Sequence, residues 1–235
     1  MKDGIIDKLR QKHGWLNDML AHMPSDLLGH WSIASVQPHE MVCEQGRMAD
    51  YFYIVTEGEF KVQHTLDDGH LVILAYLYPG ELISDIEIAL DRPYVCSVVA
   101  SAKGSVLALN TAIYRKWIAA DPGFVFILNR QLSKKLYEAG QKSIDHMSMS
   151  LRHRLARYLY KQLEHFDFNE HVACMIAFSR ENIALEWGVS VRSINRVLKD
   201  LKDRRMIFVQ KNQIICNEWS RYLLEKELQE LESKS

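Results

Sequence analysis

The sequence has little cysteine and no long hydrophobic run. Its four cysteines lie far apart in 235 residues, with no CxxC pair and no Cys/His cluster at metal-ligand spacing. This pattern favours reduced thiols over a metal centre. No apolar segment approaches the ~20 residues needed to cross a bilayer, and the first residues, MKDGIIDKLRQKHG, lack the hydrophobic core of a signal peptide. These absences predict a cytoplasmic protein that carries no metal or other cofactor.

Motifs of common enzymes are also missing. His39 and Glu40 are adjacent, but they do not belong to a zinc-binding HExxH motif. The sequence contains neither a GxSxG nucleophile motif nor a phosphate-binding P-loop. We therefore expect a protein that is not an enzyme.

The net charge is close to zero, but the charge is unevenly distributed. The formal charge of the whole chain is −1. Residues 1–150 carry 14 Lys and Arg against 18 Asp and Glu, whereas residues 151–235 carry 15 against 12. A basic C-terminal part beside an acidic N-terminal part fits a division between DNA binding and another task.

Residues 178–216 predict two short helices joined by a tight turn, followed by a two-stranded ribbon. Ser179 is a good N-cap, because its hydroxyl can accept a hydrogen bond from an amide of the first turn. The first helix would bury Ile183 and Trp187, which lie four residues apart on one face. Gly188 then supplies a turn position that needs a positive φ angle.

The second of these helices has an apolar face and a cationic face. Ser190 caps it, and its apolar residues follow the spacing of a buried stripe: Ile194, Val197, Leu198 and Leu201. Arg192, Arg196 and Lys199 recur on another face, with Asn195 alongside. Three cations in line repel each other unless a polyanion neutralises them. The pattern is similar to the helix-turn-helix motif, whose second helix enters the DNA major groove. An ordinary helical hairpin with a solvated basic face is the alternative.

Residues from about 30 to 110 show the pattern of many short strands. Turn signals such as Glu57-Gly58, Asp68-Gly69 and Pro79-Gly80 separate them. The expected strands are Ile33–Val36, Met41–Cys43, Tyr51–Thr56, Glu59–His64, Leu71–Leu77, Cys96–Ala100 and Val106–Leu109. This density of strands and turns predicts an antiparallel sandwich or roll.

Helical periodicity occupies most of the remaining chain. Residues 2–23, 111–119, 151–166 and 218–232 are expected to be helices, the first of them broken near Gly14 and ending before Pro24. The longest, from Gly123 to about His146, carries one apolar stripe: Phe124, Ile127, Leu128, Leu132, Leu136 and Ala139. A long helix with a narrow seam commonly pairs with a copy of itself. Packing of its first half against the β-rich part is the alternative.

The order of β-roll, long helix and winged helix-turn-helix resembles the CRP/FNR family of bacterial transcription regulators. The residues that carry the resemblance are Gln45-Gly46, Tyr51–Gly58 (YFYIVTEG), Tyr78–Glu81, Ser179–Glu181 and Val191–Leu198. It implies an α+β fold with a cyclic-nucleotide-binding-like β-roll (a double-stranded β-helix) in residues 1–122. A dimerisation helix and hinge at 123–150 and a winged helix-turn-helix DNA-binding domain at 151–235 would follow. Within the family, the run Ile83–Leu90 is most similar to the YeiL-type subgroup.

The resemblance places an effector pocket in the β-roll at Glu81, Ser84, Asp85, Val95 and Cys96. A receptor for cyclic AMP resembles this chain but has glycine-glutamate where Ser84-Asp85 stands, and arginine-serine where Val95-Cys96 stands. That arginine pairs with the cyclic phosphate, whereas Val95 has no charge to offer. We therefore expect that cyclic AMP is not the effector, whose identity stays open. No cysteine precedes Cys43, so the N-terminal iron–sulfur cluster of the oxygen-sensing branch is not expected.

The resemblance also implies a mode of DNA binding. A homodimer paired through the 123–150 helix would place two recognition helices in successive major grooves, about 34 Å apart, on an inverted repeat in double-stranded DNA. Arg196 matches the recognition-helix arginine that contacts guanine, Arg192 replaces a glutamate, and Asn195 could pair with adenine. Phosphate contacts are expected at Ser179, Arg180, Ser190 and Ser193, with Lys202, Arg204, Arg205 and Lys211 as further candidates or solvated charges. RNA polymerase is a further expected partner.

How the protein would sense a signal has several interpretations. Cys96 could be a redox sensor, although nearby Asp85 would raise its thiol pKa and a buried core cysteine is the simpler interpretation. His64 and His70 flank a hairpin turn and could bind a metal, although an exposed polar turn explains them as well. A regulator that needs no ligand, and a nucleotide-binding signalling module, are the competing functions.

Overall fold

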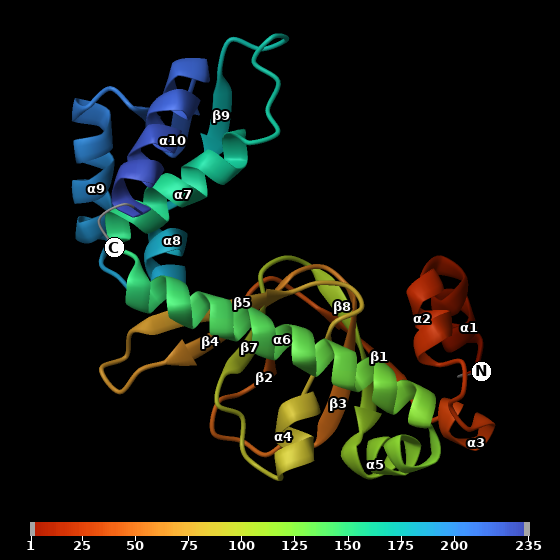
Figure 1. The fold of residues 1–235 in the computed structure, drawn as a ribbon. Helices are drawn as coiled ribbons and strands as arrows, with labels where there is room; N and C mark the ends of the chain where they lie inside the picture. The colour runs from red at the N-terminus through yellow and green to blue at the C-terminus, as the bar shows by residue number, and fades with distance from the viewer. Residues whose placement is uncertain (1–2, 233–235) are drawn as a thin grey trace. The chain divides into compact units, whose positions relative to one another are not determined.

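The computed structural model describes residues 3–232, and the side chains of all of these except 3–5, 145–147 and 232. The chain divides into two compact units, Met1–Tyr137 and Glu138–Ser235. Figure 1 follows the chain through both units from the N-terminus to the C-terminus. Among the described helices, none combines the length and the apolar character that a membrane span requires.

Three short helices open the first unit: α1 (Asp3–Lys12), α2 (Gly14–Met19) and α3 (Ser25–Leu28). The break predicted near Gly14 is confirmed, because α1 ends at Lys12 and α2 begins at Gly14. Pro24 stands just before α3, which the sequence did not predict. A proline is tolerated at this place since the first amides of a helix have no intrahelical acceptor.

Eight strands form the β-roll of the first unit. They are β1 (Ser32–Val36), β2 (Met41–Cys43), β3 (Tyr51–Glu57), β4 (Phe60–Thr65), β5 (Leu71–Leu77), β6 (Leu82–Ile83), β7 (Ser97–Ala100) and β8 (Gly104–Asn110). Two four-stranded sheets result, in the orders β1-β8-β3-β6 and β2-β7-β4-β5, and all strand pairs are antiparallel. The predicted strands and the predicted antiparallel roll are confirmed. Among these eight strands, only the two-residue strand β6 was not predicted from the sequence.

An aromatic cluster joins the β-roll to the helices α5 (Thr111–Ala120) and α6 (Pro122–Ser148). Phe52 stacks on Tyr114 with ring centroids 4.1 Å apart, and Trp117 stacks on Phe124 at 3.6 Å. Buried Asp121 accepts hydrogen bonds from Trp117 Nε1 and from the backbone amide of Phe124, both at 3.0 Å. This carboxylate therefore caps the start of α6 and fixes it to the aromatic core.

Helix α6 changes its surroundings along its length. Phe124 is buried and Leu132 is half-buried, whereas Leu136 is 76% exposed. The alternative interpretation is therefore right for the first half of the predicted stripe, which packs against its own β-roll. Further along, the apolar side chains point to solvent.

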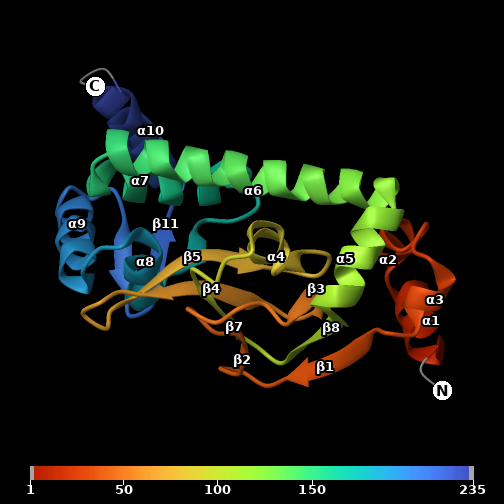
Figure 2. The same ribbon diagram turned by 90° about the horizontal axis from the view of Figure 1, so that it is seen from below.

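A short helix, α4 (Asp85–Leu90), lies between β6 and β7 and beside α6 (Figure 2). The sequence assigned no structure to this run. Ser84 before it and Asp91 after it both adopt left-handed backbone conformations, with φ of 73° and 50°. Such conformations are uncommon for residues other than glycine, so tertiary packing rather than local propensity holds this turn.

The second unit begins within α6 and continues with α7 (Leu151–Leu163), β9 (Cys174–Ala177), α8 (Arg180–Trp187), α9 (Val191–Asp203), β10 (Phe208–Gln210), β11 (Gln213–Cys216) and α10 (Glu218–Glu232). The predicted two-stranded ribbon is a three-stranded antiparallel sheet in the order β10-β11-β9. The prediction was incomplete because β9 is only four residues long and is defined by its pairing with β11, about 40 residues later in the chain.

The core of the second unit confirms the predicted stripe. Ile194, Val197, Leu198 and Leu201 are all buried against α7, α8 and the sheet. Trp187, predicted to be buried, is half-buried at the edge of this core. Its ring is 6.1 Å from that of Tyr158 and carries the guanidinium of Arg154 at 5.0 Å. A large ring with a cation over its face tolerates this partial exposure.

Candidate nucleic-acid interface

Helices α8 and α9 begin after the predicted caps, and α8 ends at the predicted turn residue. The Ser179 hydroxyl accepts a hydrogen bond from the Asn182 amide at 3.2 Å, and the Ser190 hydroxyl accepts one from the Ser193 amide at 3.1 Å. Gly188 has a φ of 61° and donates its amide to the Ala184 carbonyl. The two caps and the left-handed glycine fix the turn between the helices.

The cationic face of α9 is exposed. Arg192, Asn195, Arg196 and Lys199 all point away from the core stripe of the same helix. Within residues 3–232, no hydrogen bond or ion pair to a protein group is found for these three cations. Other arginines of the unit behave differently: Arg152 and Arg204 both bind the carboxylate of Glu227. The recognition-helix cations are therefore available to an external polyanion, such as a row of phosphates and base edges.

The serine hydroxyls predicted to contact phosphate serve first as helix caps. Ser179 and Ser190 accept amide hydrogen bonds through their oxygens, and the Ser179 hydroxyl donates its own hydrogen to Oε2 of Glu181 at 3.3 Å. The Ser190 and Ser193 hydroxyls are also 3.0 Å apart. Hydroxyls at helix N-termini, beside free amides and the positive end of the helix dipole, suit an anionic oxygen.

Arg180, another predicted phosphate contact, is half-buried and engaged within the protein. Its Nη1 donates to the Lys211 carbonyl at 2.7 Å, at the tip of the β10–β11 hairpin. The Phe178 amide donates to the neighbouring Asn212 carbonyl at 2.9 Å. Lys211 has a φ of 48°, and its side chain is exposed. The start of α8 thus holds the hairpin tip, which is the wing of this domain.

The further cation candidates fall into two groups. Lys202, Arg205 and Lys211 are exposed. Arg204 is exposed as well, but its Nη1 lies 2.7 Å from Oε2 of Glu227, whose side chain is almost fully buried. Arg204 therefore stabilises the attachment of α10 and has less freedom to reach a phosphate.

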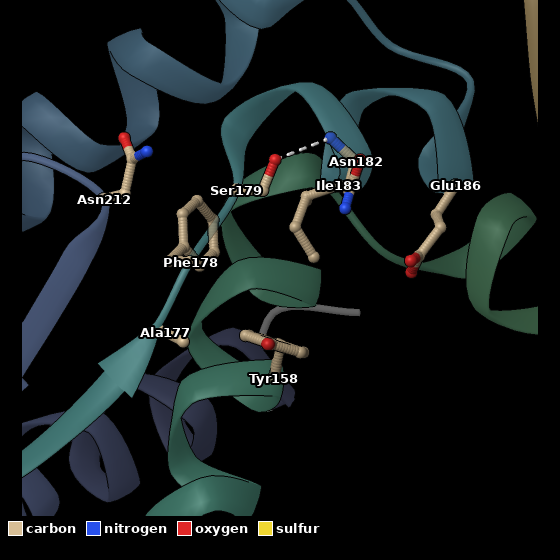
Figure 3. A pocket seen from close by; sticks show the side chains of 8 residues that line it. All are labelled: Tyr158, Ala177, Phe178, Ser179, Asn182, Ile183, Glu186 and Asn212. Carbon is tan, nitrogen blue, oxygen red and sulfur yellow. Dashed lines mark hydrogen bonds between the residues drawn. The ribbon is translucent and has the colours of Figure 1, made fainter. Parts of the chain in front are cut away.

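A pocket of about 380 Å³ lies beside the first turn of α8 (Figure 3). Tyr158, Phe178 and Ile183 form its apolar part; Ala177, Ser179, Asn182, Glu186 and Asn212 complete the lining. Burial raises the pKa of the Tyr158 phenol, and the negative charge of Glu186 adds to the shift. The lining residues come from three separate segments, so no local sequence pattern marked this pocket.

The five residues predicted to line an effector pocket have different environments in the β-roll. The Ser84 hydroxyl is buried and lies 2.5 Å from the Tyr94 hydroxyl, and the Asp85 carboxylate is buried against Lys135 of α6. Glu81 accepts a hydrogen bond from the Tyr78 amide, whereas Val95 is 66% exposed. Sequence reasoning missed Lys135 as a neighbour of this group, because its contact with Asp85 spans 50 residues.

Cys96 is half-buried, and burial raises the pKa of its thiol, with the negative charge of Glu87 as the second cause. The predicted direction of the shift is confirmed, but the carboxylate responsible is Glu87 rather than Asp85. Burial also raises the thiol pKa of Cys43 to about 11 and that of Cys216 to about 12. Such thiols are protonated at neutral pH and are poor nucleophiles.

The two hairpin histidines have separate partners. His64 Nδ1 is 2.7 Å from the Val95 carbonyl oxygen, and His70 Nδ1 is 3.1 Å from an oxygen of Asp68. Over the described side chains, no group of three or more His, Cys, Asp or Glu residues is arranged to hold a metal ion. The contact of His70 with Asp68 lies within the hairpin turn, whereas half-buried His64 lies on β4 and contacts a residue 31 positions away.

Two domain families match this chain in the order in which the two units occur. Residues 33–121 match the cyclic nucleotide-binding domain family, which covers the β-roll. Residues 153–221 match the Crp-like helix-turn-helix domain family, which covers α7 to the start of α10.

Characterised relatives match both parts. The chain is 22% identical over 182 residues to the CRP-like cAMP-activated global transcriptional regulator of Mycobacterium tuberculosis, covering 77% of this chain and 81% of that protein. It is 24% identical over 182 residues to the cAMP-activated global transcriptional regulator CRP of Salmonella typhimurium, and the match covers 77% of this chain and 87% of that protein. The solved structure of the c-di-GMP responsive global regulator CLP of Xanthomonas campestris has a similar fold, with a TM-score of 0.70, 18% identity and coverage of 87% and 98%.

Proposed function

We propose that this chain is a DNA-binding transcriptional regulator of the CRP/FNR family that acts as a homodimer on an inverted-repeat DNA site. The observation that carries this proposal is the exposed cationic face of α9, whose arginines and lysine bind no protein group within residues 3–232. An isolated row of like charges is unfavourable unless a polyanion neutralises it.

The proposed contacts follow from the positions of the side chains on α9. Arg196 would donate two hydrogen bonds to O6 and N7 of a guanine, and Asn195 would pair with an adenine. Arg192 cannot accept from a cytosine amino group as a glutamate can, so the half-site would differ from those of relatives with glutamate there. Phosphate contacts from Ser179, Ser190 and Ser193 would set the register on the duplex.

The proposed dimer forms through α6, within the segment 123–150. Phe126, Leu136 and Tyr137 are 72%, 76% and 70% exposed, although each is a large apolar or aromatic side chain. Phe126 and Tyr137 lie eleven residues apart, about three helical turns, and therefore share one face of the helix. Burial of this face against the same face of a second copy would remove it from water. In this proposal residues 1–122 form the effector domain and residues 151–235 the DNA-binding domain.

Cyclic AMP is not the effector in this proposal. Val95 is exposed and uncharged, so it cannot neutralise a cyclic phosphate. The similar proteins are named for different nucleotides: two are called cAMP-activated and one c-di-GMP responsive. We therefore expect that individual side chains of the pocket, rather than the shared fold, determine which nucleotide such a domain binds.

Four finer assignments belong to the same proposal. The similarity of Ile83–Leu90 to YeiL-type regulators would place the chain in that subgroup. RNA polymerase would be its protein partner, and the cytoplasm, where the DNA is, its location. The chain would be a regulator without enzymatic activity, as its named relatives are regulators.

The test is DNA selection from a random pool by the purified protein, followed by affinity measurements on the selected site across a salt series. Wild type should select an inverted repeat, and Arg196→Ala should lose about 1–3 kcal/mol for each guanine contact. Lys226→Ala, which removes an exposed cation from α10, is the matched control and should bind as wild type does. Equal, non-specific binding by wild type and Arg196→Ala would contradict the proposal.

A further inference from the structure

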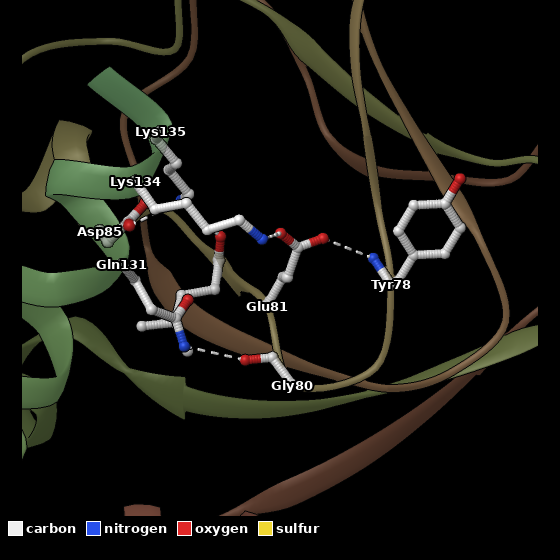
Figure 4. A network of polar contacts seen from close by, with 8 residues as sticks. Tyr78, Gly80, Glu81, Asp85, Gln131, Lys134 and Lys135 are labelled. Carbon is white, nitrogen blue, oxygen red and sulfur yellow. Dashed lines mark hydrogen bonds and ion pairs between the residues drawn. The ribbon is translucent and has the colours of Figure 1, made fainter. Parts of the chain in front are cut away.

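Three polar side chains on α6 contact one short segment of the β-roll (Figure 4). Gln131 donates to the Gly80 carbonyl at 3.0 Å, and Lys135 donates to the Leu82 carbonyl at 3.0 Å and to Asp85 at 2.7 Å. Lys134 Nζ lies 4.0 Å from a carboxylate oxygen of Glu81. The three α6 residues are spaced i, i+3 and i+4, so they extend from one side of the helix. We call this set of contacts the tether.

The ion pair of Lys135 and Asp85 is the buried centre of the tether. The Asp85 side chain is 3% exposed and that of Lys135 is 25% exposed. A carboxylate at this depth needs a partner, because water no longer solvates its charge. The outer pair of Lys134 and Glu81 is longer and more exposed, so it contributes less.

The segment held by the tether is strongly acidic. Residues 81–91 include Glu81, Asp85, Glu87 and Asp91 and contain no Lys or Arg. Their cationic partners come from helices: Lys134 and Lys135 from α6, and Arg115 of α5, which pairs with Asp91. An anionic ligand would be repelled here, whereas an ammonium group is attracted. The positive charge that balances these carboxylates already comes from side chains of the protein.

The tether also fixes the rotation of α6. Lys135 points toward the β-roll, and Leu136 and Tyr137, the next two residues, are largely exposed. At about 100° per residue, Tyr137 lies about 200° around the helix from Lys135, on the opposite side. Holding Lys135 on Asp85 therefore holds the proposed dimer face outward.

We propose that Lys135 is a positioning residue that replaces an effector: its ammonium group, paired with the buried carboxylate of Asp85, keeps α6 in the orientation for dimerisation, and DNA binding needs no nucleotide. This inference rests on the proposed function. In a ligand-controlled regulator, a diffusible ligand would bridge the β-roll and α6. Here the ion pair of Lys135 and Asp85 would make that bridge instead.

The test uses the full-length protein, freed of bound nucleotide by refolding, on its selected DNA site. Wild type should bind this site with no added ligand, and addition of cyclic AMP or cyclic di-GMP should not change its affinity. Lys135→Met should weaken both dimerisation and DNA binding by at least about fivefold, whereas Lys135→Arg should restore both. Lys116→Met, which removes an exposed lysine of α5 outside the tether, should stay within about twofold of wild type.

A second variant separates positioning from simple loss of folding. Gln131→Leu removes the contact with the Gly80 carbonyl and leaves no buried charge, so it should fold, and its affinity should fall in the same direction as that of Lys135→Met. Circular dichroism and thermal unfolding report the fold of each variant. The inference is overturned if folded Lys135→Met or Gln131→Leu binds DNA as wild type does, or if wild type binds its site only after a nucleotide is added. Absence of any specific DNA binding by wild type would instead overturn the proposed function, and this inference with it.

Discussion

Arg180 shows how a side chain predicted to contact phosphate can act through its neighbour. The sequence placed it among phosphate contacts, but its guanidinium donates to the Lys211 carbonyl at the wing tip. That carbonyl belongs to a residue with a positive φ, a conformation that costs a non-glycine residue about 1 kcal/mol or more. Arg180 therefore stabilises the wing conformation that presents the exposed Lys211 side chain.

A double-mutant cycle tests this role at the residue scale. Arg180→Gln and Lys211→Gln should each weaken DNA binding, by roughly threefold to tenfold, as expected for one phosphate contact. The effect of Arg180→Gln should shrink once Lys211→Gln is present, because both changes remove the same contact. Arg205→Gln, an exposed arginine outside the wing, should add independently to Lys211→Gln. Full additivity of Arg180→Gln with Lys211→Gln would mean that Arg180 contacts phosphate by itself.

At the scale of elements, α10 is attached to α7 and α9 through one buried carboxylate. Glu227 accepts a hydrogen bond from Arg204 Nη1 at 2.7 Å and forms an ion pair with Arg152, whose Nε is 2.7 Å from the other carboxylate oxygen. Arg152 Nη1 is also 3.1 Å from a carboxylate oxygen of Asp200 of α9. Arg204 immediately follows α9, so this network binds the end of the recognition helix to the C-terminal helix. The sequence showed only an acidic helix at 218–232.

Glu227→Gln should destabilise the second unit by about 1–3 kcal/mol, because it leaves the half-buried guanidinium of Arg152 and the more exposed one of Arg204 without their carboxylate. Urea unfolding monitored by fluorescence measures this difference. Glu225→Gln is the matched control: the same change on the same helix at an exposed position, expected to stay within about 0.5 kcal/mol. Similar stability of the two variants would show that the network contributes little.

At the scale of the whole molecule, the proposed mode of DNA recognition would need two copies acting together. A single recognition helix reads one half-site, and joining two through a dimer makes the second contact effectively intramolecular. The exposed face of α6 with Phe126 and Tyr137 is the surface proposed to join them.

Tyr137→Glu should prevent dimerisation, because two buried carboxylates would face each other across the symmetry axis. Binding to the full inverted repeat should fall by at least about 100-fold, to the level of one half-site. Sedimentation velocity and DNA titration measure the two effects. Lys116→Glu, an exposed charge change on α5, should remain dimeric and active. A dimeric Tyr137→Glu variant would place the interface elsewhere.

Features that depend on residues close together in the sequence were predicted correctly, and features that depend on distant residues were not. The caps Ser179 and Ser190, the turn residue Gly188 and the buried stripe of α9 were all predicted correctly, since each depends on residues within about two helical turns. The strands β6 and β9 were missed because two to four residues carry little periodicity, and long-range pairing decides them. Helix α4 was missed because its flanking left-handed residues, Ser84 and Asp91, have no local reason to adopt that conformation.

The sequence by itself determined the two faces of α9 and the cations on its outer face, because both are encoded in spacings of three to four residues. The tertiary structure alone decided that Lys135 meets Asp85 and that Arg180 holds Lys211. These contacts join residues 50 and 31 positions apart. They exist because sheet register and helix packing bring distant segments together, and no periodicity in the chain specifies that geometry.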